Sequence, residues 1–157
     1  MTAASLAVGG TAYPLAVITP PAKLKDLTLS DAALALIREA WAGLDPTKVL
    51  DVHCHVIGLG VGGTGCFVNP ESLSYLSPIR KLKTRFYKGA AGVYDDARAD
   101  ALFVERLVDL VQHQAPRVRV VLLPFDKHYL PDGSVDLTTT EFHTPNEYVL
   151  SLAAKHP

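Results

Sequence analysis

Three classes of protein are disfavoured by what this chain has little of. Two cysteines in 157 residues are too few for a disulfide framework, so we expect a reducing, cytoplasmic environment. No apolar run approaches the ~20 residues that a membrane-spanning helix needs, and we expect no membrane partner. The formal net charge of −1 provides no general attraction to nucleic acid, so no nucleic-acid partner is expected.

The composition is that of a globular protein. Apolar residues make up 48% of the chain and charged residues 20%, and the length suits one domain with a sizeable core. Residues 1–27 have few periodic signals, are interrupted by glycine and proline, and lack the basic start of a signal peptide. We therefore predict an N-terminal arm over residues 1–27 and a single domain over residues 28–157.

Apolar spacing, capping residues and prolines predict alternating helices and strands. Ser30 caps the first helix, Pro78 starts or kinks a second, and Thr144, Pro145 and Glu147 form a capping box before the last. The expected helices cover residues 30–44, 71–89, 95–116 and 144–157, the expected strands residues 48–56 and 117–125, and the expected turn residues 131–133.

Strands separated by helices indicate parallel βα units and an α/β fold. The apolar run from Val120 to Leu123 predicts a strand that is buried on both faces. Two parallel strands are too few for a self-sufficient sheet, so the chain is expected to be the first part of something larger. Such a part exposes strand edges and an apolar sheet face, which predicts a homo-oligomer or poor solubility.

The first predicted strand carries the pattern His-Cys-His. Side chains alternate across a strand, so His53 and His55 share one face with Asp51, while Cys54 lies on the opposite, apolar face. The histidine Cα atoms are then roughly 6.6 Å apart, which lets both rings reach one metal ion. The alternative is an amphipathic strand whose polar face meets water.

Five glycines follow between residues 58 and 65. The loop lacks the Lys-Ser/Thr pair of a P-loop and does not fit the dinucleotide-binding fingerprint, so we expect glycines that let the backbone approach the site closely. Cys66 is either a thiol near the metal or a packed loop residue. His128 and His143 flank the predicted turn, where either is a surface residue or approaches the site on a lid.

The segment VLDVHCHVIGLGVGGTGCFVNP, residues 49–70, resembles the first strand and loop of the metal-dependent amidohydrolase superfamily, in its amidohydrolase-related group. VVLLPFDKHYLPDGSVD and TPNEYVLSLAAKHP, at 120–136 and 144–157, are similar to the segments that follow in such chains. The likeness covers roughly residues 45–157. It implies the N-terminal part of a (β/α)₈ TIM barrel, with about two βα units and extra helices.

The resemblance also implies a chemistry that acts on a small-molecule substrate. His53 and His55 match the two first-strand ligands of a divalent metal, Zn foremost and Mn or Fe as alternatives, and metal-activated water would hydrolyse a C–N or C–O bond. The remaining ligands and the catalytic aspartate are expected beyond Pro157. Asp51 is either a residue that orients a ligand or a buried structural carboxylate. Asp126 follows the second strand and either contacts substrate or closes a turn.

Three alternatives remain open from the sequence. The same group contains metal-dependent decarboxylases. A TatD-like phosphoesterase or deoxyribonuclease has a similar first strand. The basic run Arg80–Lys88 with Phe86 and Tyr87 favours it, although this run also suits a solvated helix face, and the long loop over residues 58–70 disfavours it. A truncated, non-catalytic module is the third alternative.

Overall fold

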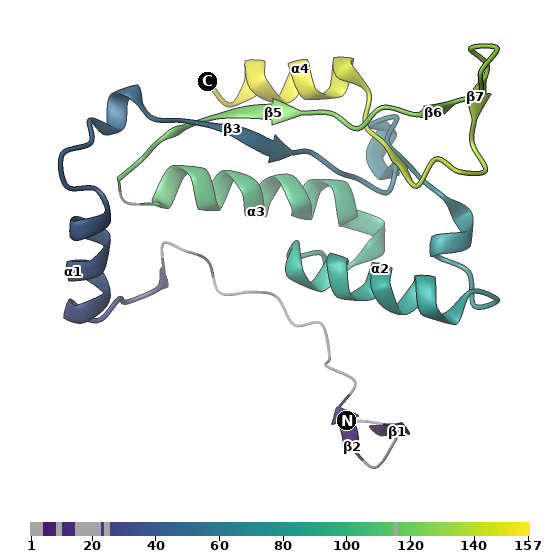
Figure 1. Ribbon diagram of the computed structural model, residues 1–157, viewed down its shortest axis with the longest axis horizontal. Coiled ribbons are helices and arrows are strands. Elements are labelled where there is room, and N and C mark those ends of the chain that lie inside the picture. Colours follow the sequence, from purple (N-terminus) through teal and green to yellow (C-terminus); the bar gives the residue numbers. More distant parts are fainter. Residues whose placement is uncertain (1–4, 9–10, 15–22, 24–25, 115) are drawn as a thin grey trace.

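The computed structural model describes residues 5–8, 11–14, 23, 26–114 and 116–157, which form a mixed α/β structure (Figure 1). The helices are α1 (Asp31–Ala40), α2 (Pro78–Ala90), α3 (Ala99–His113) and α4 (Asn146–Lys155), with short 3₁₀ turns at Pro46–Lys48, Val61–Gly63, Pro70–Ser72 and Asp96–Arg98. Among these residues, no helix is both long enough and apolar enough to cross a membrane.

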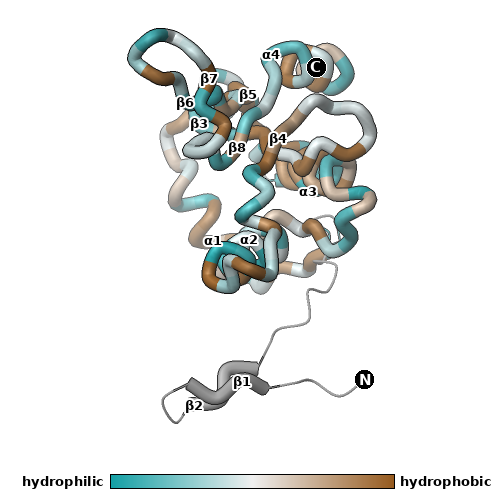
Figure 2. The backbone as a smooth tube through the Cα atoms, turned by 90° about the vertical axis from the view of Figure 1, so that its right-hand side faces the viewer, coloured by the Kyte–Doolittle hydropathy of each residue, from teal (hydrophilic) through white to brown (hydrophobic). Residues whose placement is uncertain are grey.

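The central pair of strands is parallel, as predicted. β3 (Leu50–His55) pairs with β5 (Arg119–Leu123), and α3 lies between them in the chain. Both α3 and α4 pack against one cluster at the end of this pair, which is built on Val56, Val149 and Leu152 with Leu122 beside them. Hydrophobic segments of α3, β4 and β5 gather where these elements meet (Figure 2). The described part of the chain therefore has βα units, and it does not close into a barrel.

The prediction that the second strand is buried on both faces is wrong for this structure. Val121 of β5 is exposed, and in β3 the exposed fractions of Leu50 and Val52 are 43% and 63%. The strand pair is apolar, but within the described residues no layer covers both of its sides. Apolar composition alone did not indicate that one side would be open.

The regular alternation expected along the first strand is also interrupted. Asp51 stands opposite Val120 and Cys54 opposite Leu122, so three steps along β3 match two along β5. An irregularity of this kind is a β-bulge, in which one strand, here β3, has an extra residue and the direction of the side chains after it changes. Cys54 and His55 still point to opposite faces, because Leu122 belongs to the helix-covered cluster and Leu123, opposite His55, is its neighbour.

Three short antiparallel pairs complete the sheets. They are β1 (Ser5–Val8) with β2 (Thr11–Pro14), β4 (Phe67–Val68) with β8 (Phe142–His143), and β6 (His128–Tyr129) with β7 (Val135–Asp136). The turn predicted at 131–133 is confirmed, and Gly133 takes a φ of +84° within it. The predicted arm boundary at residue 27 stays a prediction, since much of residues 1–27 lies outside the described residues.

Two of the three helix-start signals are confirmed, but the second helix is shorter than the expected range of 71–89, because α2 begins only at Pro78. The Ser30 side chain accepts a hydrogen bond from the Ala33 amide at 3.2 Å, and Pro78 occupies the first turn of α2. The capping box at Thr144 is wrong, because α4 begins at Asn146 after Pro145. The Thr144 hydroxyl is buried and donates instead to the Val56 carbonyl at 2.7 Å. A tertiary hydrogen bond thus replaces the local one that the sequence suggested.

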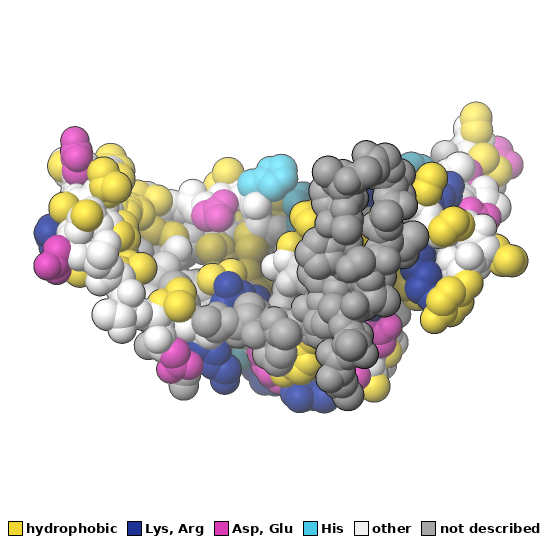
Figure 3. All heavy atoms as spheres, turned by 90° about the horizontal axis from the view of Figure 1, so that it is seen from below, with side chains coloured by type: hydrophobic (Ala, Val, Ile, Leu, Met, Phe, Trp, Pro, Cys, Tyr) yellow, Lys and Arg dark blue, Asp and Glu magenta, His cyan; other side chains and the backbone are white. Residues whose placement is uncertain are grey.

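Helix α2 turns its apolar side chains outward. Ile79, Leu82 and Phe86 recur at helical spacing with exposed fractions of 83%, 60% and 73%, whereas Thr84 on the opposite side is buried. Apolar and basic side chains lie side by side over this helix in the view from below (Figure 3). The predicted solvated helix face is therefore an apolar stripe with basic neighbours.

Candidate functional site

The two histidines of β3 lie together at the carboxyl end of the parallel strands. The ring centroids of His53 and His55 are 4.8 Å apart and meet edge to face. Their side chains are thus on one side of the strand, as the alternation predicted. In open and closed α/β folds this end of the strands is where active sites are found.

The surroundings of His55 are aromatic. Phe125, which follows β5, stacks on the His55 ring with centroids 4.2 Å apart, and Phe142 lies 6.1 Å from Phe125. The His55 Nδ1 atom is buried and has no hydrogen-bond partner among the described residues. A buried polar nitrogen without a hydrogen-bond partner raises the free energy of the folded state. The His55 Nδ1 atom is therefore suited to bind a group that the described residues do not provide.

The His143 ring contacts this cluster at the backbone carbonyl of Phe125. Its Nδ1 atom and the Phe125 carbonyl oxygen are 2.9 Å apart, and it stands opposite Phe67 in the β4–β8 pair. The histidine flanking the predicted turn is therefore linked to His55 through Phe125, whose carbonyl it contacts and whose ring stacks on His55. His128 is exposed in β6, and its backbone amide donates to Thr140.

The two aspartates proposed from sequence make local contacts. Asp51 is exposed and its carboxylate accepts a hydrogen bond from the His53 amide at 2.9 Å, so it acts on the backbone of the strand and not on an imidazole. Asp126 accepts from the Lys127 amide at 2.7 Å and from the Tyr129 hydroxyl at 3.1 Å, which raises the pKa of Tyr129. Its described contacts are those of a turn carboxylate, next to Phe125.

Within residues 26–114 and 116–157, no group of three or more His, Cys, Asp or Glu side chains is placed to hold a metal ion. His53 and His55 are imidazoles of the type that zinc and similar metals prefer. Their number is one fewer than the three protein ligands usual in a catalytic zinc site. As donors the residues fit a divalent metal, but as a set they supply part of a site.

The glycine loop is held by a residue that sequence analysis did not single out. Asp100, in the first turn of α3, is buried, and its carboxylate accepts hydrogen bonds from the amides of Leu59 at 2.6 Å and Gly60 at 3.1 Å. The Thr64 hydroxyl donates to it as well. A Cβ atom on Gly58 would lie 2.5 Å from the same carboxylate, so glycine there permits a close approach.

Cys66, at the end of the loop, is a packed residue in this structure. It is buried, and burial is the main cause that raises the pKa of its thiol. A raised pKa leaves the thiol protonated near neutral pH, and the protonated form is a poor ligand and nucleophile. The packed-residue alternative is therefore the one that its environment favours.

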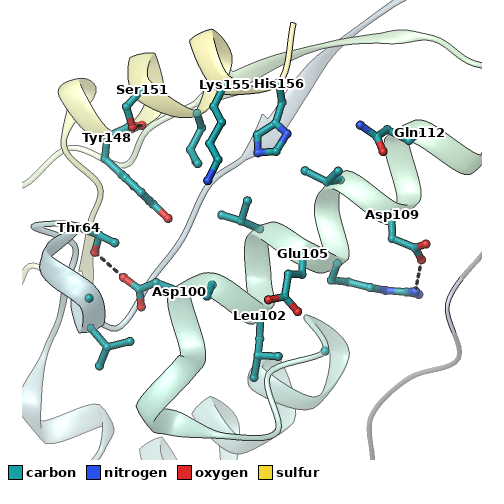
Figure 4. A pocket seen from close by; sticks show the side chains of 18 of the residues that line it. Thr64, Asp100, Leu102, Glu105, Asp109, Gln112, Tyr148, Ser151, Lys155 and His156 are labelled. Carbon is teal, nitrogen blue, oxygen red and sulfur yellow. Dashed lines mark hydrogen bonds and ion pairs between the residues drawn. The ribbon is translucent and has the colours of Figure 1, made fainter.

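A groove of about 790 Å³ lies between α3 and α4, away from the histidine pair (Figure 4). Tyr148 and Lys155 point into it from α4, and Asp100 and Glu105 face them from α3. Burial, with smaller contributions from Asp100 and Cys66, raises the pKa of Tyr148 to about 12. At neutral pH the Tyr148 side chain in this wall is therefore an uncharged phenol.

No family model matches the chain, and comparison with curated proteins and with solved structures likewise gives no match.

Proposed function

We propose that this chain is the N-terminal part of a metal-dependent hydrolase of the amidohydrolase type, which cleaves a C–N or C–O bond. The observation that carries the proposal is the His53–His55 pair: two imidazoles on one side of a parallel strand, with the buried His55 Nδ1 atom unpartnered. The resemblance of residues 49–70 to the first strand and loop of that superfamily supports the same assignment.

We also propose that β3 and β5 are two strands of a (β/α)₈ barrel. Two features support this: the strands are parallel, and α3 and α4 both pack against one cluster that includes Leu122 and Val56. In such a barrel the helices lie outside and the other side of each strand faces the interior, which is consistent with the uncovered Val52 and Val121. Further strands would then supply the remaining ligands.

The residues of this chain have separable roles in the proposed site. A bound divalent metal, Zn in the first instance, supplies a water of lowered pKa and polarises the scissile bond. His53 and His55 would hold the metal, and the Phe125 ring fixes the plane of His55 by stacking. Phe125 and Phe142 form an apolar wall beside the pair that excludes water. His143 holds the Phe125 carbonyl and thereby the position of that wall.

The proposal is tested by loading the protein, together with the strands that the proposal places after Pro157, with Zn²⁺ and assaying a panel of esters, amides and phosphoesters. We expect metal-dependent hydrolysis of an ester or amide, and its loss by roughly 100-fold or more in His53→Ala, because removing a ligand costs more than disturbing the residues behind it. His113→Ala, on the exposed end of α3, is the matched control.

Each alternative has its own outcome in this experiment. Turnover confined to phosphoesters would favour the TatD-like class, and carbon dioxide release from a carboxylic acid substrate would favour a decarboxylase. Undetectable metal together with absent turnover would overturn the proposal in favour of a non-catalytic module.

A further inference from the structure

The carboxylate of Asp100 fills a small anion cradle made by the glycine loop. Its side chain is 2% exposed, and the three hydrogen bonds to it come from Leu59, Gly60 and Thr64, all within the loop. Successive backbone N–H groups around a residue of positive φ make a concavity that suits an anion, and Gly60 has a φ of +85°. The anion that the glycine loop binds is therefore a side chain of the same protein, the Asp100 carboxylate.

This cradle is connected to the histidine pair through a series of contacts. After Thr64 and Cys66 the chain enters β4, which pairs with β8 so that Phe67 stands opposite His143. The His143 ring is bonded to the Phe125 carbonyl, and Phe125 stacks on His55. The conformation of the loop thus sets where β4 begins, and β4 in turn sets the strand that supports the stacking partner of His55.

We propose that Asp100 is a positioning residue, whose carboxylate in the glycine-loop cradle fixes the loop and, through β4 and β8, the orientation of His55. The effect on the loop is independent of the proposed function. The consequence for metal binding rests on it, because that consequence requires His55 to be a ligand.

The test is amide hydrogen exchange in Asp100→Ala with sodium formate as the probe, and with sodium chloride at equal ionic strength as its control. Leu59 and Gly60 donate to Asp100. Their exchange should accelerate roughly 10- to 100-fold in the variant, as expected for loss of a hydrogen bond to a charged group. Formate, a free carboxylate that fits the space left by the side chain, should slow it again.

A purely structural role predicts a different result. If Asp100 merely stabilised the whole fold, exchange would rise equally in β5 and α4, and formate would have no effect. Either equal acceleration throughout or unchanged exchange at Leu59 and Gly60 would overturn the proposal. Glu105→Gln is the matched control, since Glu105 lies on the same helix, is exposed and pairs with Arg98.

Asp100→Asn is a second variant that keeps the test decisive if Asp100→Ala does not fold. Its amide keeps one acceptor oxygen, so one of the two loop amides should retain its protection and the other should lose it, without any response to formate. Full protection of both amides in this variant would contradict the proposal.

Side-chain ¹H–¹⁵N spectra distinguish the positioning role of Asp100 from metal binding by His55. In Asp100→Ala the His55 and His143 signals should shift while His113 and His156 stay in place, and formate should restore them. If these signals move as expected but His55 binds no Zn²⁺, the positioning role stands and the proposed function fails.

Discussion

At the scale of single residues, the placement of the His53 and His55 rings on one side of the strand was predicted from the sequence, although the register of β3 shifts between Asp51 and Cys54. What the sequence did not indicate is the partner of each side chain. Phe125 is 70 residues from His55, and Asp100 is about 40 residues from the loop amides that it accepts from, so neither contact has a local signal. Contacts of this kind depend on how the helices dock against the strands.

Thr144 shows how a tertiary contact overrides a local motif. Thr144→Val removes a buried hydroxyl that donates to the Val56 carbonyl and leaves this carbonyl without that bond. We expect the free energy of unfolding to fall by about 1–3 kcal/mol in urea denaturation, the usual cost of an unsatisfied buried group. Thr47→Val is the control. Its hydroxyl bonds an exposed aspartate, so a change within about 0.5 kcal/mol is expected. Equal losses in the two variants would refute the distinction.

At the scale of elements, the positions of the two central strands and the helix-start signals at Ser30 and Pro78 were predicted, whereas the burial and regularity of the strands were not. Ser30 and Pro78 act within one turn of their own helices, so their signals are local and survive folding. The burial of β5 and the regularity of β3 depend on what covers each face and on a bulge. An apolar run such as Val120–Leu123 indicates neither which face of the strand is covered nor where a bulge occurs.

The hairpin formed by β6 and β7 contains a carboxylate that responds to acid. Hydroxyl groups of Thr138 and Thr139 donate to Asp136 and hold its pKa at about 2, below its ordinary value of 3.8. Since the folded pKa is lowered, this stabilisation is present above about pH 4 and is lost as the pH falls toward 2. Asp136→Asn should flatten that part of the stability–pH curve, measured by urea denaturation. A curve of unchanged slope would contradict the assignment.

The outward stripe of α2 predicts association between molecules. Leu82 and Phe86 are exposed and apolar, so replacing both with glutamine should weaken concentration-dependent self-association while changing the thermal midpoint little. Sedimentation velocity checks the first expectation and thermal unfolding the second. Leu150→Gln, at an exposed site on α4, is the control that should leave association as it is. Wild-type protein that stays monomeric at all concentrations would contradict this prediction.

At the scale of the whole molecule, the described residues contain two βα units built on one parallel pair of strands. The strand pair has one side covered by helices, its other side open, and an aromatic–histidine cluster at the carboxyl end. The sequence predicted the α/β class and the position of the histidine pair, because strand and helix periodicities are local. It could not predict the cluster around them, which is assembled from β3, β5 and β8.

The proposed function depends most on His53 and His55 acting together as metal ligands. A Zn²⁺ titration followed through the histidine side-chain ¹H–¹⁵N signals tests it directly. We expect that the His53 and His55 signals shift together, that His113 and His156 respond only at higher Zn²⁺, and that His55→Ala abolishes the response of His53. A His53 response that survives His55→Ala, or Zn²⁺ that binds first at His113 or His156, would contradict it.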